Sequence, residues 1–180
     1  MLKQLGFLFN ADLCIGCRSC EAACINENKT PAGVRWRRVT PTSENSFLSI
    51  SCNHCDSPEC FRICPQKAFS KQRDGIVMID NGLCDGCMKC LPVCPFEAPQ
   101  FDLRQRKASK CIFCHERLKQ NLLPACIEAC PTEALQMIDL NKEIPEGSVR
   151  TIPGFPDILL TKPSIRFYPS QAGKRYFIQD

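Results

Sequence analysis

CDGCMKCLPVCP, residues 84–95, holds four cysteines in the spacing C-x2-C-x2-C-x3-C and ends in proline. CIGCRSCEAAC, residues 14–24, repeats that spacing. A third quartet at 52–64 has four residues before its third cysteine instead of two, and a fourth at 111–130 has eleven. These four quartets use all 16 cysteines of the 180-residue chain, so the fold has to be built around them.

Cysteine runs of this kind hold [4Fe-4S] clusters by four thiolates each, and the fourth cysteine of a run binds the other cluster of a pair. Because about a tenth of the chain is cysteine, we expect clusters to replace part of the hydrophobic core that a short chain cannot supply. The sequence predicts four [4Fe-4S] clusters as cofactors. It predicts no catalytic residue, since it shows no nucleophile with a base, no phosphate loop and no paired carboxylates.

Two other cysteine-rich architectures fit less well. A disulfide framework scatters its cysteines along a small secreted chain, whereas nearly all of these recur at two to four intervening residues. Zinc sites also use C-x2-C pairs, but two separated pairs suffice for zinc and leave the third and fourth cysteines of a quartet unexplained. A zinc-stabilised interaction module stays open as an alternative.

The formal net charge of +4 is compatible with a nucleic-acid partner, but the negative charge of the predicted cofactors outweighs it. A [4Fe-4S] core with four thiolates carries about −2, so four clusters add about −8 and make the loaded protein acidic. Basic residues at Arg35, Arg37, Arg38 and 104–110 flank the quartets, and we expect them to form solvated faces near anionic sites. No nucleic-acid partner is predicted.

No run of the sequence reaches the eighteen or so apolar residues that a membrane span needs, so we predict no direct span. Residues 1–10 contain one lysine and lead straight into the first quartet without a small-residue cleavage site. We therefore expect no signal peptide in this chain.

An internal duplication organises the chain, because FNADLC at 9–14 aligns with IDNGLC at 79–84. Each copy is expected to place a short strand, at 6–9 and at 76–79, before a ligand loop whose last cysteine lies on a helical turn. Three quartets end in Cys-Pro, which should end a helix and turn the chain toward a return strand. These dipeptides are Cys64-Pro65, Cys94-Pro95 and Cys130-Pro131.

The residue before the second cysteine shapes each ligand loop. Gly16 and Gly86 hold this position in two quartets and predict a positive φ there. His54 and Phe113 hold the equivalent positions in the other two. Because phenylalanine adopts a left-handed backbone poorly, we expect the fourth loop to have a different shape.

Linker lengths indicate which quartets pair. Nineteen residues separate the second quartet from the third, enough for a turn, a strand and a hairpin within one two-cluster unit. We expect an α+β fold of two nested bacterial-ferredoxin-like modules, with short β-hairpins and short helices around paired [4Fe-4S] clusters. The inner module spans 50–102, the outer module joins 1–49 to 103–140, and an irregular, proline-rich C-terminal tail at 141–180 packs on these modules or on a partner.

Exchange of the fourth cysteine within each pair of quartets predicts four ligand sets. They are Cys14, Cys17, Cys20 and Cys130 for cluster 1; Cys111, Cys114, Cys126 and Cys24 for cluster 2; Cys52, Cys55, Cys60 and Cys94 for cluster 3; and Cys84, Cys87, Cys90 and Cys64 for cluster 4. Loss of a fourth cysteine should therefore damage a cluster whose other ligands are distant in sequence.

Other residues near the predicted ligands are candidates for tuning. The neighbouring lysines are Lys67, Lys89, Lys107 and Lys110. A lysine there can raise a local reduction potential, although such lysines are usually solvated. His54 and His115 each adjoin a cysteine, but complete thiolate sets favour structural roles for both. Trp36 is expected to pack in the fold or to lie at an interface rather than to relay electrons.

Three stretches resemble the four-cluster [4Fe-4S] ferredoxin-type electron-transfer (beta) subunits of the dimethyl sulfoxide reductase superfamily. They read CNHCDSPECFRICP, CDGCMKCLPVCPFEAPQFD and KCIFCHERLKQNLLPACIEACPTEAL. The resemblance covers about residues 5–140 and includes the four- and eleven-residue gaps. Without large insertions, the chain is most similar to the subunits of dimethyl sulfoxide and polysulfide reductases.

This resemblance implies a non-catalytic electron-transfer subunit of an anaerobic respiratory oxidoreductase. Its partners would be a molybdopterin catalytic subunit, with molybdenum or tungsten, and an integral membrane anchor that reacts with quinone. The complex would be membrane-associated, either co-exported to the periplasmic face with a signal-bearing partner or kept in the cytoplasm. A free-standing polyferredoxin is the alternative, and the apolar tail and the duplicated scaffold disfavour it.

Overall fold

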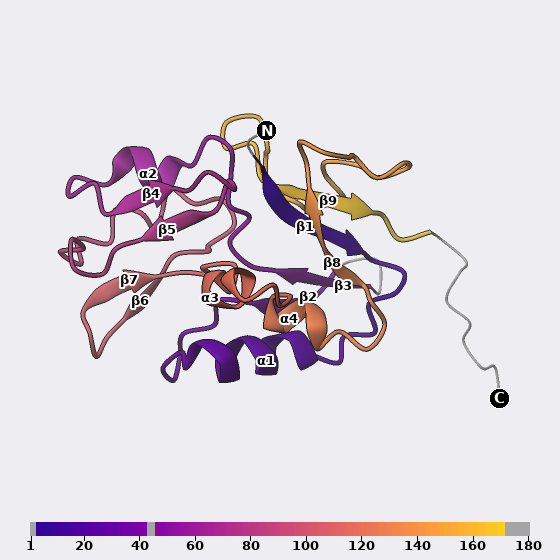
Figure 1. Ribbon diagram of the computed structural model, residues 1–180, viewed down its shortest axis with the longest axis horizontal. Coiled ribbons are helices and arrows are strands. Elements are labelled where there is room, and N and C mark those ends of the chain that lie inside the picture. The colour runs from indigo at the N-terminus through magenta and orange to yellow at the C-terminus, as the bar shows by residue number, and fades with distance from the viewer. Residues whose placement is uncertain (1–2, 43–45, 172–180) are drawn as a thin grey trace.

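The computed structural model describes residues 3–42 and 46–171, which form a small α+β fold of short elements (Figure 1). The helices in these ranges are α1 (Ser19–Asn28), α2 (Glu59–Ile63), α3 (His115–Lys119) and α4 (Ala125–Glu128). The strands are β1 (Leu5–Asn10), β2 (Arg38–Pro41), β3 (Phe47–Ile50), β4 (Phe69–Lys71), β5 (Val77–Ile79), β6 (Gln100–Asp102), β7 (Lys107–Ser109), β8 (Leu135–Asp139) and β9 (Ile165–Tyr168). None of these helices has the length and apolar character of a membrane span.

A three-stranded sheet in the order β8-β1-β9 joins segments that are far apart in sequence (Figure 1). β1 runs antiparallel to β8, with Phe9 opposite Leu135, and parallel to β9, with Phe9 beside Phe167. Gly6 permits the close approach on the β9 side, because a Cβ at this position would lie 2.3 Å from the carbonyl oxygen of Ser164. The sheet therefore ties the first strand to both the fourth quartet and the tail.

The remaining strands of the described residues form three hairpins, β2–β3, β4–β5 and β6–β7. The β4–β5 hairpin lies between the second and third quartets, and the β6–β7 hairpin follows the third. The strands predicted at 6–9 and 76–79 are confirmed as β1 and β5, although β5 begins one residue later than predicted.

Each Cys-Pro dipeptide is followed by a tight turn and then by a strand, as predicted. The third residue after the cysteine is left-handed in every case, with φ of 50° at Lys67, 50° at Glu97 and 53° at Glu133. Helices α2 and α4 precede two of the dipeptides, but only turns precede Cys94. The expected helix is missing there because Pro92 lacks an amide hydrogen and disfavours helix at the residue before it.

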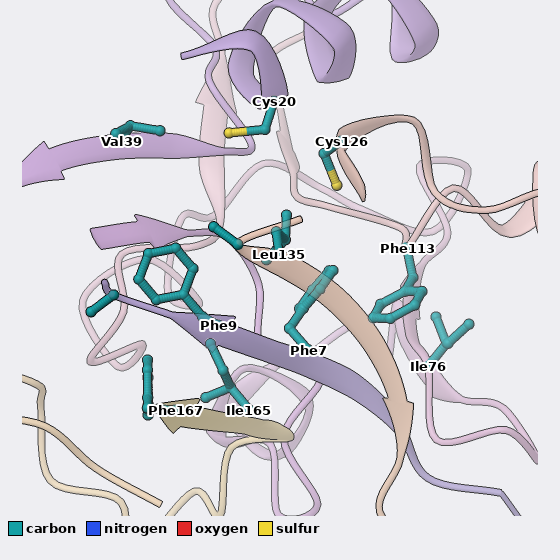
Figure 2. Close-up of a cluster of buried hydrophobic side chains, with 12 residues drawn as sticks. Phe7, Phe9, Cys20, Val39, Ile76, Phe113, Cys126, Leu135, Ile165 and Phe167 are labelled. Carbon is teal, nitrogen blue, oxygen red and sulfur yellow. The ribbon is translucent and has the colours of Figure 1, made fainter. Parts of the chain in front are cut away.

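The largest hydrophobic core packs around β1 and includes cysteines of the first and fourth quartets (Figure 2). Phe7 stacks on Phe113 with 4.5 Å between ring centroids. Cys20 and Cys126 are buried members of this core, and the other buried clusters of the described residues also contain cysteines. The thiols are therefore part of the packing that holds the fold together.

The tail contains regular structure, contrary to the expectation of an irregular segment. Ile165 and Phe167 of β9 are buried and alternate with half-buried neighbours, which is the period of a strand with one face on the core. Phe155 packs between Phe96 and Phe167, with ring centroids 5.2 and 4.8 Å away. The described part of the tail thus packs on its own chain, while the expectation for 172–180 lies outside the described residues.

Candidate metal centres

The ligand loops share a left-handed backbone at the residue before the second cysteine. The φ angle there is 72° at Gly16, 41° at His54, 76° at Gly86 and 57° at Phe113. The expected difference in the fourth loop does not lie at Phe113, because packing against Phe7 and His54 offsets a backbone cost of about 1–2 kcal/mol there. The fourth loop departs one residue later, where Cys114 is also left-handed and precedes α3.

Backbone amides point at the sulfur atoms of several predicted ligands. The amide of Ala68 donates to the Sγ of Cys64 at 3.4 Å, and that of Ala98 donates to the Sγ of Cys94 at 3.5 Å. Both alanines follow the left-handed residue of a Cys-Pro turn, which gives the repeated Cys-Pro-x-x-Ala pattern a structural reason. Such hydrogen bonds orient a metal ligand and raise the reduction potential of the group that it holds.

Polar side chains add further contacts to the sulfur atoms of predicted ligands. The contacting groups are side-chain hydroxyls and one side-chain amide, on residues of α1 and β3. The contacts are Ser19 Oγ to Cys17 Sγ at 3.4 Å, Ser49 Oγ to Cys20 Sγ at 3.4 Å, and Asn28 Nδ2 to the Sγ atoms of Cys24 at 3.7 Å and Cys114 at 4.0 Å.

Burial controls the acidity of most of these thiols. It raises the pKa of Cys24 and Cys60 to about 12 and the pKa of Cys90 to about 11. Cys17 is the exception at the surface, because the hydroxyl of Ser19 lowers its pKa. A buried thiol of this kind becomes a thiolate when a metal coordinates it.

Thiols of different quartets also lie close enough to repel one another as thiolates. This repulsion raises their pKa values further, although burial has the larger effect. The interacting thiols are Cys14 with Cys20, Cys130 and Cys17; Cys24 with Cys126 and Cys114; Cys55 with Cys52, Cys94 and Cys60; and Cys90 with Cys84, Cys87 and Cys64. The fold therefore brings the last cysteine of each quartet close to cysteines of another.

One such group of thiols lines a small pocket. Its lining includes Cys52, Cys55, Cys60 and Cys94, together with Asn53, Phe96 and Lys110. The buried side-chain amide of Asn53 has no hydrogen-bond partner among the described residues. An all-thiol donor set suits iron–sulfur groups, which soft thiolate ligands select.

Two basic side chains are buried beside these thiols, so the expectation that both are solvated is wrong. Arg37 is 2% exposed and Lys110 is 1% exposed. The Nζ of Lys110 donates to the carbonyl oxygens of Cys111, at 3.1 Å, and Val77. A buried cation is strongly unfavourable without negative charge nearby, and thiolate-bound iron–sulfur groups supply that charge.

His54 and Trp36 each form a hydrogen bond within the fold. The Nδ1 of His54 accepts a hydrogen bond from the amide of Val77 at 3.1 Å. Burial, with a contribution from the nearby charge of Lys110, holds the pKa of His54 well below its ordinary value, so the ring is neutral. The indole Nε1 of Trp36 donates to Ser109 Oγ at 3.1 Å.

Comparison with known proteins identifies the family. Residues 43–140 match the 4Fe-4S dicluster domain. The B subunit of anaerobic dimethyl sulfoxide reductase from Escherichia coli (strain K12) is 34% identical over 188 residues, covering 94% of this chain and 91% of that protein. The protein of the same name from Haemophilus influenzae is 32% identical with the same coverage, and the B subunit of polysulfide reductase from Wolinella succinogenes is 34% identical over 92% of this chain and 88% of its own length. The chain therefore belongs to the 4Fe-4S dicluster domain family, among the non-catalytic iron–sulfur electron-transfer subunits of the dimethyl sulfoxide reductase superfamily.

Proposed function

We propose that this chain carries four [4Fe-4S] clusters as an electron-transfer wire in a membrane-associated anaerobic respiratory oxidoreductase. One end of the wire meets a molybdopterin catalytic subunit, and the other meets an integral membrane anchor that reacts with quinone. The observation that carries this proposal is the gathering of thiols from different quartets, one group of which lines a cavity. Family membership supports the partners, because the relatives named above are the B subunits of reductases.

The ligand sets of this proposal are those predicted from linker lengths. In each pair of quartets, the fourth cysteine of one quartet binds the cluster held by the first three cysteines of the other. Support comes from the proximity of Cys130 to Cys14 and of Cys24 to Cys126 for the outer pair. The pairing of β1 with β8 also joins the flanks of the proposed outer module across residues 50–102. The two modules are thus proposed to be nested.

Bound [4Fe-4S] clusters supply one-electron transfer without making or breaking a substrate bond. The thiolates of this chain hold the iron, and burial of most of them excludes water. The amides of Ala68 and Ala98 donate to ligand sulfur, and Lys110 places a cation beside Cys60 and Cys94. These residues favour the more negative, reduced form and so raise reduction potentials.

Electrostatic interactions between thiols of different sets order the proposed wire. Cys20 faces Cys126, Cys111 faces Cys52, and Cys60 faces Cys90, which links cluster 1 to 2, 2 to 3 and 3 to 4. The two sets at the ends contain the exposed ligands Cys17 and Cys87. Exposed apolar side chains, Ile15 and Leu83, lie beside these ends. We therefore propose that electrons enter and leave through these two loops.

Anaerobic purification with its partner subunits tests this function. We expect about 16 iron and about 16 acid-labile sulfide per chain, which is the content of four cubanes, and co-purification with a molybdopterin protein. Zinc in place of iron would identify the zinc-stabilised module instead. A loaded chain that is a stable monomer in native mass spectrometry of cell extract would identify a free-standing polyferredoxin.

A further inference from the structure

Arg37 is held inside the fold by β3 and its extension. Its Nη1 donates to the Oγ of Ser49 at 3.1 Å, and its Nη2 donates to the Oγ of Ser51 at 2.9 Å. The guanidinium also lies over the ring of Phe7, with Cζ 4.5 Å from the centroid. Ser49 and Ser51 are two residues apart and face the same side of an extended chain, so they form a fixed cradle for one guanidinium.

Within residues 3–42 and 46–171, no carboxylate forms an ion pair with this guanidinium. The anionic groups that face it are the thiolates of Cys126, Cys111, Cys20 and Cys24, which belong to the proposed ligand sets of clusters 1 and 2. Among the described residues, these cysteines are therefore the source of counter-charge for the buried cation when they hold an anionic group.

Ser49 connects the guanidinium to one ligand. Its Oγ accepts a hydrogen bond from Arg37 and lies 3.4 Å from the Sγ of Cys20. A metal-bound Cys20 is a thiolate without a proton, so only the hydroxyl can donate across this contact. Because the Oγ already accepts from Arg37, its own hydrogen is left for the sulfur, and the guanidinium polarises it.

We propose that Arg37 and Ser49 act together as positioning residues that raise the reduction potential of the cluster held by Cys20. This inference rests on the proposed function. Reduction adds one electron to the site and transfers no proton, so the net charge of the cluster and its thiolates changes from about −2 to about −3. The hydrogen bond from Ser49 and the charge of Arg37 both stabilise the more negative state.

Ser49 and Arg37 should affect different numbers of clusters, and this difference can be measured. Ser49 contacts the sulfur of Cys20, whereas the charge of Arg37 faces thiols of both clusters 1 and 2. Loss of the hydroxyl should therefore lower one potential. Loss of the guanidinium should lower two.

Redox titration of the anaerobically purified complex, followed by electron paramagnetic resonance, tests this pattern, with the cluster 1 signal assigned as the one altered by Cys14→Ser. In Ser49→Ala we expect the oxidised-to-reduced ratio of cluster 1 at a fixed potential to rise about tenfold, equivalent to 59 mV for one electron. Ser49→Thr keeps the hydroxyl and should leave the cluster 1 potential at the parent value. Arg37→Gln should lower two potentials, and the exposed Arg35→Gln, which removes the same charge, should lower none.

An unchanged cluster 1 potential in Ser49→Ala, or equal shifts of all signals, would overturn the proposal. Loss of cluster 1 from Ser49→Ala would also overturn it, because the hydroxyl would then be needed for assembly rather than tuning. If Arg37→Gln does not assemble, Ser49→Ala and Ser49→Thr decide the matter. Failure of the proposed function is distinguishable, since the parent complex itself would then lack four clusters.

Discussion

Asn28, the last residue of α1, donates its side-chain amide toward the Sγ of Cys114 at 4.0 Å, although 86 positions separate the two residues. The same nitrogen lies 3.7 Å from the Sγ of Cys24. Helices α1 and α4 lie side by side in the fold (Figure 1). One side chain therefore contacts thiols of the first and fourth quartets, which is the arrangement that interlocked quartets require.

Gly86 is predicted to be intolerant of any side chain. A Cβ there would lie 2.2 Å from the carbonyl oxygen of Arg106, and φ is 76°. Gly86→Ala should lower both the melting temperature and the iron content of the complex. Gly33→Ala is the matched control, because Gly33 also has a positive φ but has no atom within 4 Å of the added Cβ. The control should lose only about 1–2 kcal/mol of stability, and equal losses in the two variants would show that the contact with Arg106 is unimportant.

Lys110→Met is expected to lower the potential of the cluster proposed at Cys52, Cys55 and Cys60, because the buried ammonium lines the same pocket. The carbonyl oxygens of Val77 and Cys111 would also lose their donor, at a cost of about 1–3 kcal/mol. Redox titration and thermal unfolding measure the two effects. The exposed Lys89→Met removes a charge near Cys90 and should change neither quantity appreciably. A potential that does not respond to Lys110→Met would rule out tuning by this lysine.

The tail is predicted to be an integral part of the fold. Phe167 is 0% exposed and packs on Phe155, so Phe167→Ala should reduce the free energy of unfolding by about 3–5 kcal/mol. Leu159 is 78% exposed, and Leu159→Ala should change it by less than about 0.5 kcal/mol. The two variants are compared by unfolding them in urea under anaerobic conditions and monitoring the loss of cluster absorbance. Similar midpoints for both variants would contradict a structural role for β9.

Removal of iron with an oxidant and a chelator is expected to unfold the chain. Each buried hydrophobic cluster of the described residues contains cysteine thiols, so loss of the metal removes the bonds that hold these segments together. The buried Arg37 and Lys110 also lose their counter-charge. Far-ultraviolet circular dichroism should lose its folded signature, and retention of that signature would show that protein packing alone maintains the fold.

Features set by local chemistry could be predicted from the sequence. The Cys-Pro turns and the strands at 6–9 and 76–79 depend on proline and on neighbouring residues, and the structure has them. A proline inside the third quartet was enough to remove one expected helix, because a single missing amide hydrogen acts locally.

Features set by remote neighbours could not be predicted. Arg37 and Lys110 look like surface residues in sequence, but they are buried and hydrogen-bond to Ser49 of β3 and Val77 of β5, which are remote in sequence. The left-handed backbone at Phe113 likewise depends on packing rather than on intrinsic preference. Strand β9 pairs with β1, and the short apolar pieces of the tail do not reveal that partner.

The central claim is that Cys24 is a ligand of cluster 2, whose other ligands lie in the fourth quartet. Electron paramagnetic resonance of three variants tests it most directly. Cys24→Ser, Cys114→Ser and Cys14→Ser are compared in the purified, reduced complex. We predict that Cys24→Ser alters the same cluster signal as Cys114→Ser and leaves intact the signal altered by Cys14→Ser. If Cys24→Ser alters the signal of Cys14→Ser instead, each quartet closes its own cluster and the interlocked arrangement is wrong.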